Sequence, residues 1–91
     1  MRFEWDEAKR RANLKLHGID FAVVEKVLDG ATFTVLDDRF DYAEMRLQTF
    51  GLLRDEVVAI THTETDELIR VISVRKATKH EEESYFKEVN Y

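Results

Sequence analysis

The sequence contains no cysteine, no apolar run long enough to cross a membrane and no apolar segment near its start. The first absence excludes disulfides, thiolate metal ligands and a cysteine nucleophile. The second argues against a membrane-spanning helix, which needs about 20 apolar residues. The third argues against secretion, because a signal peptide carries an apolar core. We therefore expect a cytoplasmic protein that folds without covalent cross-links.

The motifs of several enzyme classes are also missing. The sequence has no glycine-rich phosphate loop, no G-x-S-x-G nucleophile motif and no H-E-x-x-H zinc motif. The three histidines, His17, His62 and His80, fall on three different expected elements, so their pattern does not suggest a metal site. We expect no cofactor and no bound metal.

The length and the charge of the chain limit its class. With 91 residues, 44% of them hydrophobic, it is expected to form a single globular domain over 1–91. Its net charge of −5 argues against a general nucleic-acid coat protein. However, the ranges 9–17 and 70–80 each hold four Lys or Arg and no acid. Such segments could form one positive face, or they could be part of a mixed solvated surface.

Apolar periodicity and capping residues predict an α+β domain with a short N-terminal strand, two helices, an antiparallel meander and a C-terminal helix. Asp6 and Asp20 are the expected N-caps of the first two helices, and Thr78 and Glu81 form a capping box before the last. The expected strands are 2–5, 31–38, 44–53, 55–63 and 68–76, the last two as a hairpin, and the first helix is 7–17.

Two sets of apolar residues are expected to bury the first two helices. Ala8, Ala12 and Leu16 are spaced by four and predict a thin apolar stripe on the first helix. A second set follows the pattern of a core-facing helix. It consists of Phe21, Val24, Val27 and Leu28.

Two arginines lie in the last expected strand. Arg70 and Arg75 are five apart, an odd spacing that predicts opposite faces of a regular strand. Arg75 would share its face with Val71 and Ser73 and would lie just before a helix N-terminus, which favours anions. Two interpretations stay open for Arg75: it binds an anion, or it pairs with a nearby carboxylate.

Two further positions could carry chemistry. Glu44 and Arg46 are two apart and are expected on one strand face. Glu44 could be a base or could orient the arginine, or the two could form a weak surface ion pair. His17 lies at the end of the first helix, where it could donate a proton or contact a phosphate, or only complement the helix dipole.

Over nearly its whole length the chain resembles the BrnT family, the toxins of BrnT–BrnA type II toxin–antitoxin systems. The resemblance lies in the order and spacing of FEWDEAKRRAN, HGIDF, DDRFDYAEMR and IRVISVRKATKHE. It implies a RelE-like ribonuclease fold and RNA cleavage that blocks translation. It also implies a hetero-oligomer with a BrnA-like ribbon-helix-helix antitoxin, through which alone the toxin would contact DNA.

The chain departs from the family pattern at four positions, and the changes remove positive charge. Leu16 and Ala43 replace a lysine and a glycine, and His80 and Glu82 are found where arginines are common. These departures keep a second interpretation open. In it the protein is a catalytically weak or inactive binding module that mainly sequesters its antitoxin or acts as a corepressor with it.

Metal-free RNA cleavage needs a base for the 2′-hydroxyl, an acid for the leaving 5′-oxygen and cations at the phosphate. Given the resemblance, we expect Arg75 and Arg46 to clamp the scissile phosphate, and Glu44 or His17 to act as base or acid. The residues expected to bind RNA are Lys9, Lys15, Lys76, Lys79 and His80, and those expected at the antitoxin interface are Arg70 and Tyr85.

Overall fold

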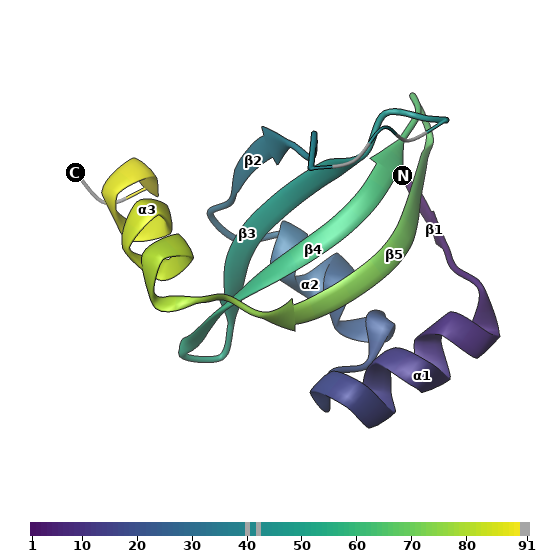
Figure 1. The fold of residues 1–91 in the computed structure, drawn as a ribbon, viewed down its shortest axis with the longest axis horizontal. Helices are drawn as coiled ribbons and strands as arrows, with labels where there is room; N and C mark the ends of the chain where they lie inside the picture. Colours follow the sequence, from purple (N-terminus) through teal and green to yellow (C-terminus); the bar gives the residue numbers. More distant parts are fainter. Residues whose placement is uncertain (40, 42, 90–91) are drawn as a thin grey trace.

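The fold is a five-stranded sheet with helices on both of its faces (Figure 1). A computed structural model describes residues 1–39, 41 and 43–89. The predicted α+β class and the predicted order of elements are confirmed. In chain order the elements are β1 (Arg2–Glu4), α1 (Glu7–His17), the 3₁₀ turn η1 (Phe21–Val23), α2 (Val24–Leu28), β2 (Phe33–Leu36), β3 (Leu47–Leu53), β4 (Glu56–Glu64), β5 (Leu68–Lys76) and α3 (Lys79–Val89).

The strands lie in the order β1-β5-β4-β3-β2. Strands β2 to β5 are antiparallel neighbours, which confirms the predicted meander and its last hairpin. Strand β1 pairs parallel to β5, so the sheet is mixed. Pairing of β3 with both of its neighbours begins at Leu47, three residues later than predicted. Glu44 and Arg46 therefore lie in the preceding loop, and the prediction that they share a strand face is wrong because no ladder fixes their alternation.

Helix α1 has the predicted ends but not the predicted buried face. The Asp6 carboxylate accepts a hydrogen bond from the Lys9 amide at 3.1 Å, and Gly18 ends the helix in the left-handed region at φ 73°. The predicted stripe, Ala8, Ala12 and Leu16, is exposed. Asn13 is the buried residue of α1, because the helix docks through a polar contact at a sheet edge.

The contact of Asn13 closes the edge of β5 beyond the short strand β1. Its Nδ2 donates to the carbonyl oxygen of Val74 at 2.8 Å, and its Oδ1 accepts from the Val74 amide at 3.1 Å. A further hydrogen bond from Nδ2 to the carbonyl oxygen of Ile19, at 3.0 Å, ties the helix end to the same place. The side-chain amide thus makes both hydrogen bonds that a neighbouring strand would make.

The larger apolar core lies between the sheet and α2, which Figure 1 shows behind the strands. We call this side of the sheet the core face. Helix α2 lies directly on β3, since a Cβ at Gly51 would be 2.6 Å from Cγ1 of Val27. Among the predicted core residues Leu28 is only half-buried. The buried members of this core are Phe21, Val24, Val27, Val58, Ile60, Ile69, Val71 and Val74.

A smaller apolar cluster lies on the opposite side of the sheet, under α3, and we call this side the α3 face. Tyr85 is buried there, and its hydroxyl donates to the carbonyl oxygen of Ala31 at 2.7 Å. Phe50, Val57 and Ala59 complete the buried cluster. Of the described helices, none lies over the other half of the α3 face (Figure 1).

The predicted capping box of α3 is confirmed. The Thr78 amide donates to Oε1 of Glu81 at 2.8 Å, and the Glu81 amide donates to the Thr78 hydroxyl at 3.2 Å. The box fixes where the chain turns from β5 into α3. In the described part of the chain, no helix has the length and apolar character needed to span a membrane.

Candidate functional site: an arginine face

Cross-strand pairing arranges the side chains of the α3 face in three successive rows, which change from apolar through uncharged polar to charged. The row that reaches α3 is mostly apolar but ends in an arginine. The next row holds hydrogen-bonding groups, and the third holds charges. The rows are Phe33–Phe50–Ala59–Arg75, then Val35–Gln48–Thr61–Ser73, then Thr63–Arg70 on β4 and β5 with Asp37–Arg46, which are joined by a backbone hydrogen bond just beyond the ends of β2 and β3.

Strand β5 contains a β-bulge at Ile72. Ser73 pairs with Thr61, whereas Val71 pairs with His62, so one residue of β5 has no counterpart on β4. Side chains alternate strictly only while the pairing is regular. The extra residue therefore reverses the alternation between the two halves of β5.

Because of this bulge, Arg70 and Arg75 lie on the same face of the sheet. They pair with Thr63 and Ala59, which are four apart on β4 and so point the same way. The prediction that the two arginines face opposite sides is wrong, since it assumed an uninterrupted strand. Val71, which was predicted beside Arg75, lies in the core on the other face.

Arg75 forms a two-pronged ion pair with Glu81. Its Nη1 and Nη2 donate to the two carboxylate oxygens at 2.7 and 2.9 Å, and the side chains are 26% and 22% exposed. Chiefly because of this hydrogen-bonded partner, the pKa of Glu81 is lowered to about 2. The interpretation in which Arg75 pairs with a carboxylate is thus confirmed.

The pairing leaves part of the Arg75 guanidinium available. The group has five N–H donors, and Nη1 also donates to the carbonyl oxygen of Lys76 at 3.3 Å. Among the described residues, the Nε–H and the second Nη2–H have no partner. These two donors point in the same direction from the planar group, an arrangement that can meet two oxygens of one phosphate.

A second ion pair borders the same face. The carboxylate of Asp37, whose side chain is 1% exposed, accepts from Nε and Nη2 of Arg39 at 2.7 and 2.9 Å. The pKa of Asp37 is lowered, mainly by the hydrogen bonds from Arg39 and further by the charge of Arg46. Sequence reasoning missed Arg39. The sequence signal for Arg39 is its place directly after Asp37 and Asp38. If one of these carboxylates is buried, it needs a cationic partner, and Arg39 is the nearest one along the chain.

The three arginines share one electrostatic environment. The pKa of Arg75 is raised, first by its hydrogen bond to Glu81, while the charge of Arg39 lowers it and the charge of Asp37 raises it. Arg46 acts in turn on Asp37. We call this group, Arg39, Arg46 and Arg75 with the carboxylates Asp37 and Glu81, the arginine face. Its members come from the β2–β3 loop, the end of β5 and the first turn of α3.

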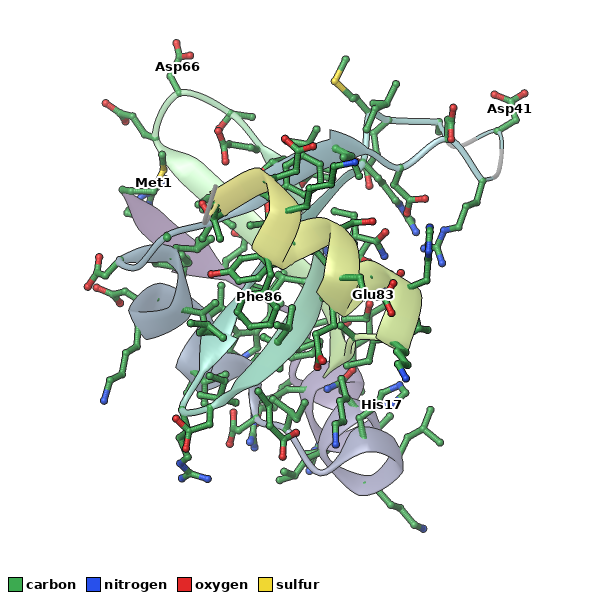
Figure 2. The ribbon with its side chains drawn as sticks, turned by 90° about the vertical axis from the view of Figure 1, so that its left-hand side faces the viewer. Met1, His17, Asp41, Asp66, Glu83 and Phe86 are labelled. Atoms are coloured by element: carbon green, nitrogen blue, oxygen red, sulfur yellow. The ribbon has the colours of Figure 1, made fainter. Side chains whose placement is uncertain are left out.

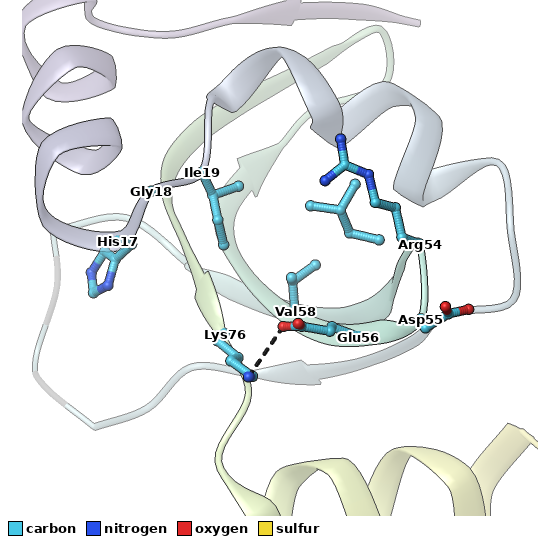
Figure 3. A pocket seen from close by; sticks show the side chains of 9 residues that line it. His17, Gly18, Ile19, Arg54, Asp55, Glu56, Val58 and Lys76 are labelled. Atoms are coloured by element: carbon cyan, nitrogen blue, oxygen red, sulfur yellow. Dashed lines mark ion pairs between the residues drawn. The ribbon is translucent and has the colours of Figure 1, made fainter.

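His17 lies in another part of the molecule. Figure 2 shows His17 at the α1 end, and Asp41, in the β2–β3 loop, at the opposite end. His17, Ile19 and Lys76 line a cavity of about 420 Å³, and none of the three arginines lines it. Figure 3 shows these lining side chains. Nζ of Lys76 is 3.2 Å from a carboxylate oxygen of Glu56. A catalytic role of His17 stays a prediction.

The predicted catalytic residue Glu44 and the remaining predicted RNA contacts are spread over the surface. Glu44 is exposed in the loop before β3, and Lys9 and Lys15 are exposed on α1. Lys79 and His80 are exposed on the first turn of α3, next to the arginine face in the sequence. Within the described residues, none of the five has a hydrogen bond or ion pair from its side chain.

The two predicted antitoxin contacts differ in exposure. Arg70 is half-exposed and lies 3.5 Å from a carboxylate oxygen of Glu4. Tyr85 is 1% exposed and holds α3 on the sheet, whereas its neighbour Phe86 is 39% exposed. Figure 2 shows Phe86 and Glu83 on α3, the helix nearest the viewer. On α3, the aromatic side chain that a partner protein could contact is therefore Phe86 rather than Tyr85.

His62 is buried on the core face and is not part of the arginine face. Its Nε2 and the hydroxyl of Thr49 are hydrogen-bonded at 2.8 Å, and Thr49 bonds in turn to Thr34 at 2.8 Å. Among the described residues, Nδ1 of His62 has no partner. The pKa of His62 is lowered, chiefly because burial disfavours the charged ring.

Comparison with known families gives one match. Residues 5–81 match the family described as "Ribonuclease toxin, BrnT, of type II toxin-antitoxin system". The match covers more than four fifths of the chain and includes every member of the arginine face. No curated protein matches the sequence.

Proposed function

The chain belongs to the BrnT family of ribonuclease toxins, and we propose that it cleaves RNA at the arginine face. One observation carries the proposal: Arg39 and Arg46 of the β2–β3 loop and Arg75 at the end of β5 lie around two carboxylates at the α3 face. Three guanidinium groups and two carboxylates leave one positive charge in excess, which favours binding of a further anion. A phosphodiester supplies such an anion, and its negative charge grows in the transition state.

The two carboxylates position the arginines. Asp37 and Glu81 each hold one guanidinium by two hydrogen bonds, which fixes the direction of the donors that remain. Their lowered pKa values make both of them weak bases at neutral pH. The base and the acid must therefore be other groups. Glu44, one of the two predicted candidates, lies in the loop that also carries Arg39 and Arg46, whereas His17, the other candidate, lies away from the arginine face.

In the proposed reaction the ribose 2′-oxygen attacks phosphorus as the base removes its proton. The bond from phosphorus to the 5′-oxygen breaks, and the acid protonates that oxygen. The products are a 2′,3′-cyclic phosphate and a 5′-hydroxyl end. The Nε–H and second Nη2–H of Arg75 bind two non-bridging oxygens, and Arg46 adds positive charge. Lys79 and His80 would hold the flanking RNA.

All positive charge in this scheme comes from side chains, so we expect cleavage without a metal ion. The measurement is the rate constant for cutting a labelled RNA in the presence of EDTA, compared with added Mg²⁺. Equal rate constants are expected. Loss of cleavage in EDTA, restored by Mg²⁺, would contradict this part of the proposal.

A toxin of a type II system has a cognate antitoxin. We infer that this antitoxin is a ribbon-helix-helix protein that binds DNA itself and forms a hetero-oligomer with the toxin domain 1–91. Its acidic side chains would occupy the arginine face and exclude RNA. Expression of the chain alone separates this scheme from a mere binding module: growth arrest supports the nuclease, and harmless expression contradicts it.

The test of the site is Arg75→Ala, measured as RNA cleavage by the purified protein and as growth arrest on expression. Loss of a cation that acts in the transition state should lower the rate constant by about 100-fold or more. Arg75→Lys keeps the charge but not the fork, and should recover only part of the activity. Thermal unfolding of each variant checks that it is folded.

The matched control is Arg11→Ala. Arg11 is exposed, and at about 100° per residue it points away from Asn13, the residue through which α1 docks. Its removal should change the rate constant by less than about threefold. A folded Arg75→Ala protein that cuts RNA as fast as the Arg11→Ala protein would refute the site.

A further inference from the structure

Between the arginines lies a row of three uncharged polar side chains, Gln48, Thr61 and Ser73, which we call the polar row. We propose that the polar row binds the nucleobase next to the cleaved bond and so determines which RNA sequences are cut. This inference rests on the proposed function of the arginine face, and it adds a specificity-determining element to it.

The first argument is position. Gln48, Thr61 and Ser73 are direct cross-strand partners on β3, β4 and β5. At about 4.8 Å between strands, the row is about 10 Å long, which suits a flat ring system lying along it. Arg75 is the last residue of the row on one side, next to Ser73 on β5, and Arg46 belongs to the row on the other side, next to Gln48 along the chain. A nucleotide whose phosphate lies among the arginines therefore has its base within reach of the row.

The second argument is the hydrogen bonding of Gln48. The residue is 7% exposed, and its Nε2 has no hydrogen-bond partner in the described part of the chain. The other buried carboxamide, Asn13, is equally covered, yet its side chain makes three hydrogen bonds. Buried polar groups are normally paired, and an unpaired one marks a place where a partner is missing.

The neighbours of Gln48 also make no side-chain hydrogen bond. Thr61 is 5% exposed, and within the described residues neither its hydroxyl nor that of Ser73 is paired, although these two oxygens, unlike Nε2 of Gln48, are not fully buried. On the core face, by contrast, the hydroxyl of Thr49 is bonded on both sides, to Thr34 and His62. A sheet position that served only packing would be better filled by an apolar side chain.

The chemistry of the row selects a nucleobase over a phosphate. A carboxamide both donates and accepts, and a hydroxyl can do either, whereas a phosphate offers only acceptors. Base edges place donors and acceptors side by side, and proteins read single-stranded RNA by bonding to these edges. The arginines take the phosphate, so the uncharged row is left for the base. Ser73, which is half-buried, gives the row its contact with solvent.

The experiment maps every cut that the purified chain makes in a library of single-stranded RNA with random bases. The wild type should cut at preferred bases beside the scissile bond. Gln48→Met keeps the volume but removes both hydrogen-bonding atoms, and should reduce the ratio of preferred to other cuts by about tenfold. Thr61→Val, which removes one hydroxyl, should change the same ratio by a smaller factor.

The matched control is Thr34→Val, which removes a sheet hydroxyl outside the row and should leave the cutting pattern unchanged. Wild-type cuts without base preference, or a folded Gln48→Met protein with the wild-type pattern, would overturn the inference. Failure of the proposed function has a different signature. In that case Arg75→Ala would leave the amount of cleavage unchanged, whatever the pattern of cuts. If Gln48→Met does not fold, the ratio of preferred to other cuts is measured for Thr61→Val instead. A folded Thr61→Val protein with the wild-type ratio would then overturn the inference.

Discussion

The two faces of the sheet are built from the same strands but are filled in opposite ways. On β4, Ile60 is fully buried in the main core, while the next residue, Thr61, belongs to the polar row on the α3 face. The core face is mostly apolar and is covered by η1 and α2. The α3 face is apolar only under α3 and then carries polar and charged groups. Alternation along a strand thus lets one face provide most of the apolar core while the other face holds polar and charged groups.

Substitutions on the two faces should therefore differ in what they change. On the core face they should lower the free energy of unfolding, and on the α3 face they should mainly alter activity. The strongest test uses the neighbouring residues of β4. Ile60→Ala should cost about 3 kcal/mol, because it removes a fully buried side chain and leaves a cavity. Thr61→Ala should cost less than about 1 kcal/mol and should alter cleavage instead.

Urea unfolding of both proteins, followed by circular dichroism, measures this difference, and the cleavage assay is run beside it. Equal losses of stability at Ile60 and Thr61 would show that the α3 face is as important for folding as the core face.

The next largest loss of stability is expected at Asn13, which closes the edge of the sheet. Asn13→Ala should cost about 2–3 kcal/mol, because the amide and the carbonyl of the fully buried residue Val74 lose their partners. Asn13→Asp keeps an acceptor for the Val74 amide but loses the donor to the Val74 carbonyl oxygen. Its free energy of unfolding should therefore lie between those of Asn13→Ala and the wild type. Urea midpoints give the comparison. A loss of less than about 0.5 kcal/mol in Asn13→Ala would mean that water replaces the side chain.

The ion pair between Arg75 and Glu81 on the α3 face should contribute less to the free energy of unfolding, and its contribution should depend on pH. Glu81→Gln can keep the capping hydrogen bond, so it isolates the pair with Arg75, and we expect a loss of about 1–2 kcal/mol at pH 7. A lowered folded-state pKa, here about 2, stabilises the fold at pH values above the ordinary carboxyl pKa of 4.5. This contribution is lost as the pH falls from 4.5 towards 2.

Unfolding free energies of the wild type and of Glu81→Gln at pH 7 and pH 3 test this expectation. The difference between the two proteins should shrink at pH 3. A difference that is the same at both pH values would mean that the pair does not stabilise the fold.

The smallest effect is expected at His62, a titratable group on the core face. Burial lowers its pKa, so the unfolded chain binds a proton more readily than the folded protein. Its contribution to stability is complete above pH 6.5 and is lost as the pH falls below that value, by up to about 1 kcal/mol near pH 5.5. His62→Gln should weaken this dependence, which unfolding at pH 8 and pH 5.5 measures.

What could be predicted from the sequence was local. Asp6, Asp20 and the box of Thr78 and Glu81 act within a few residues of themselves, and all three caps form as predicted. Strand and helix order followed from the same short-range signals. The apolar stripe of α1 failed because a helix can dock through one polar side chain, and no periodicity records that.

Much of the candidate site depends on contacts between distant segments. The bulge at Ile72 changes the face of Arg70 relative to Arg75, and a bulge is defined by the partner strand rather than by the residue itself. The role of Arg39 follows from the burial of Asp37, because the buried carboxylate is the group that Arg39 pairs with. Arg75 was predicted for its place before a helix, and the structure adds the carboxylate that holds it.

The hydrogen bonds between Asn13 and Val74 join residues that are 61 positions apart. During synthesis, α1 leaves the ribosome early but has no sheet edge to dock on until β5 has been made. Arg75 and Glu81 follow Val74 almost at once. We therefore expect nascent chains that end before Val74 to be cut by protease within α1 and to be unable to cleave RNA. Completion of the fold and assembly of the arginine face would then coincide, because both depend on the residues from Val74 to Glu81.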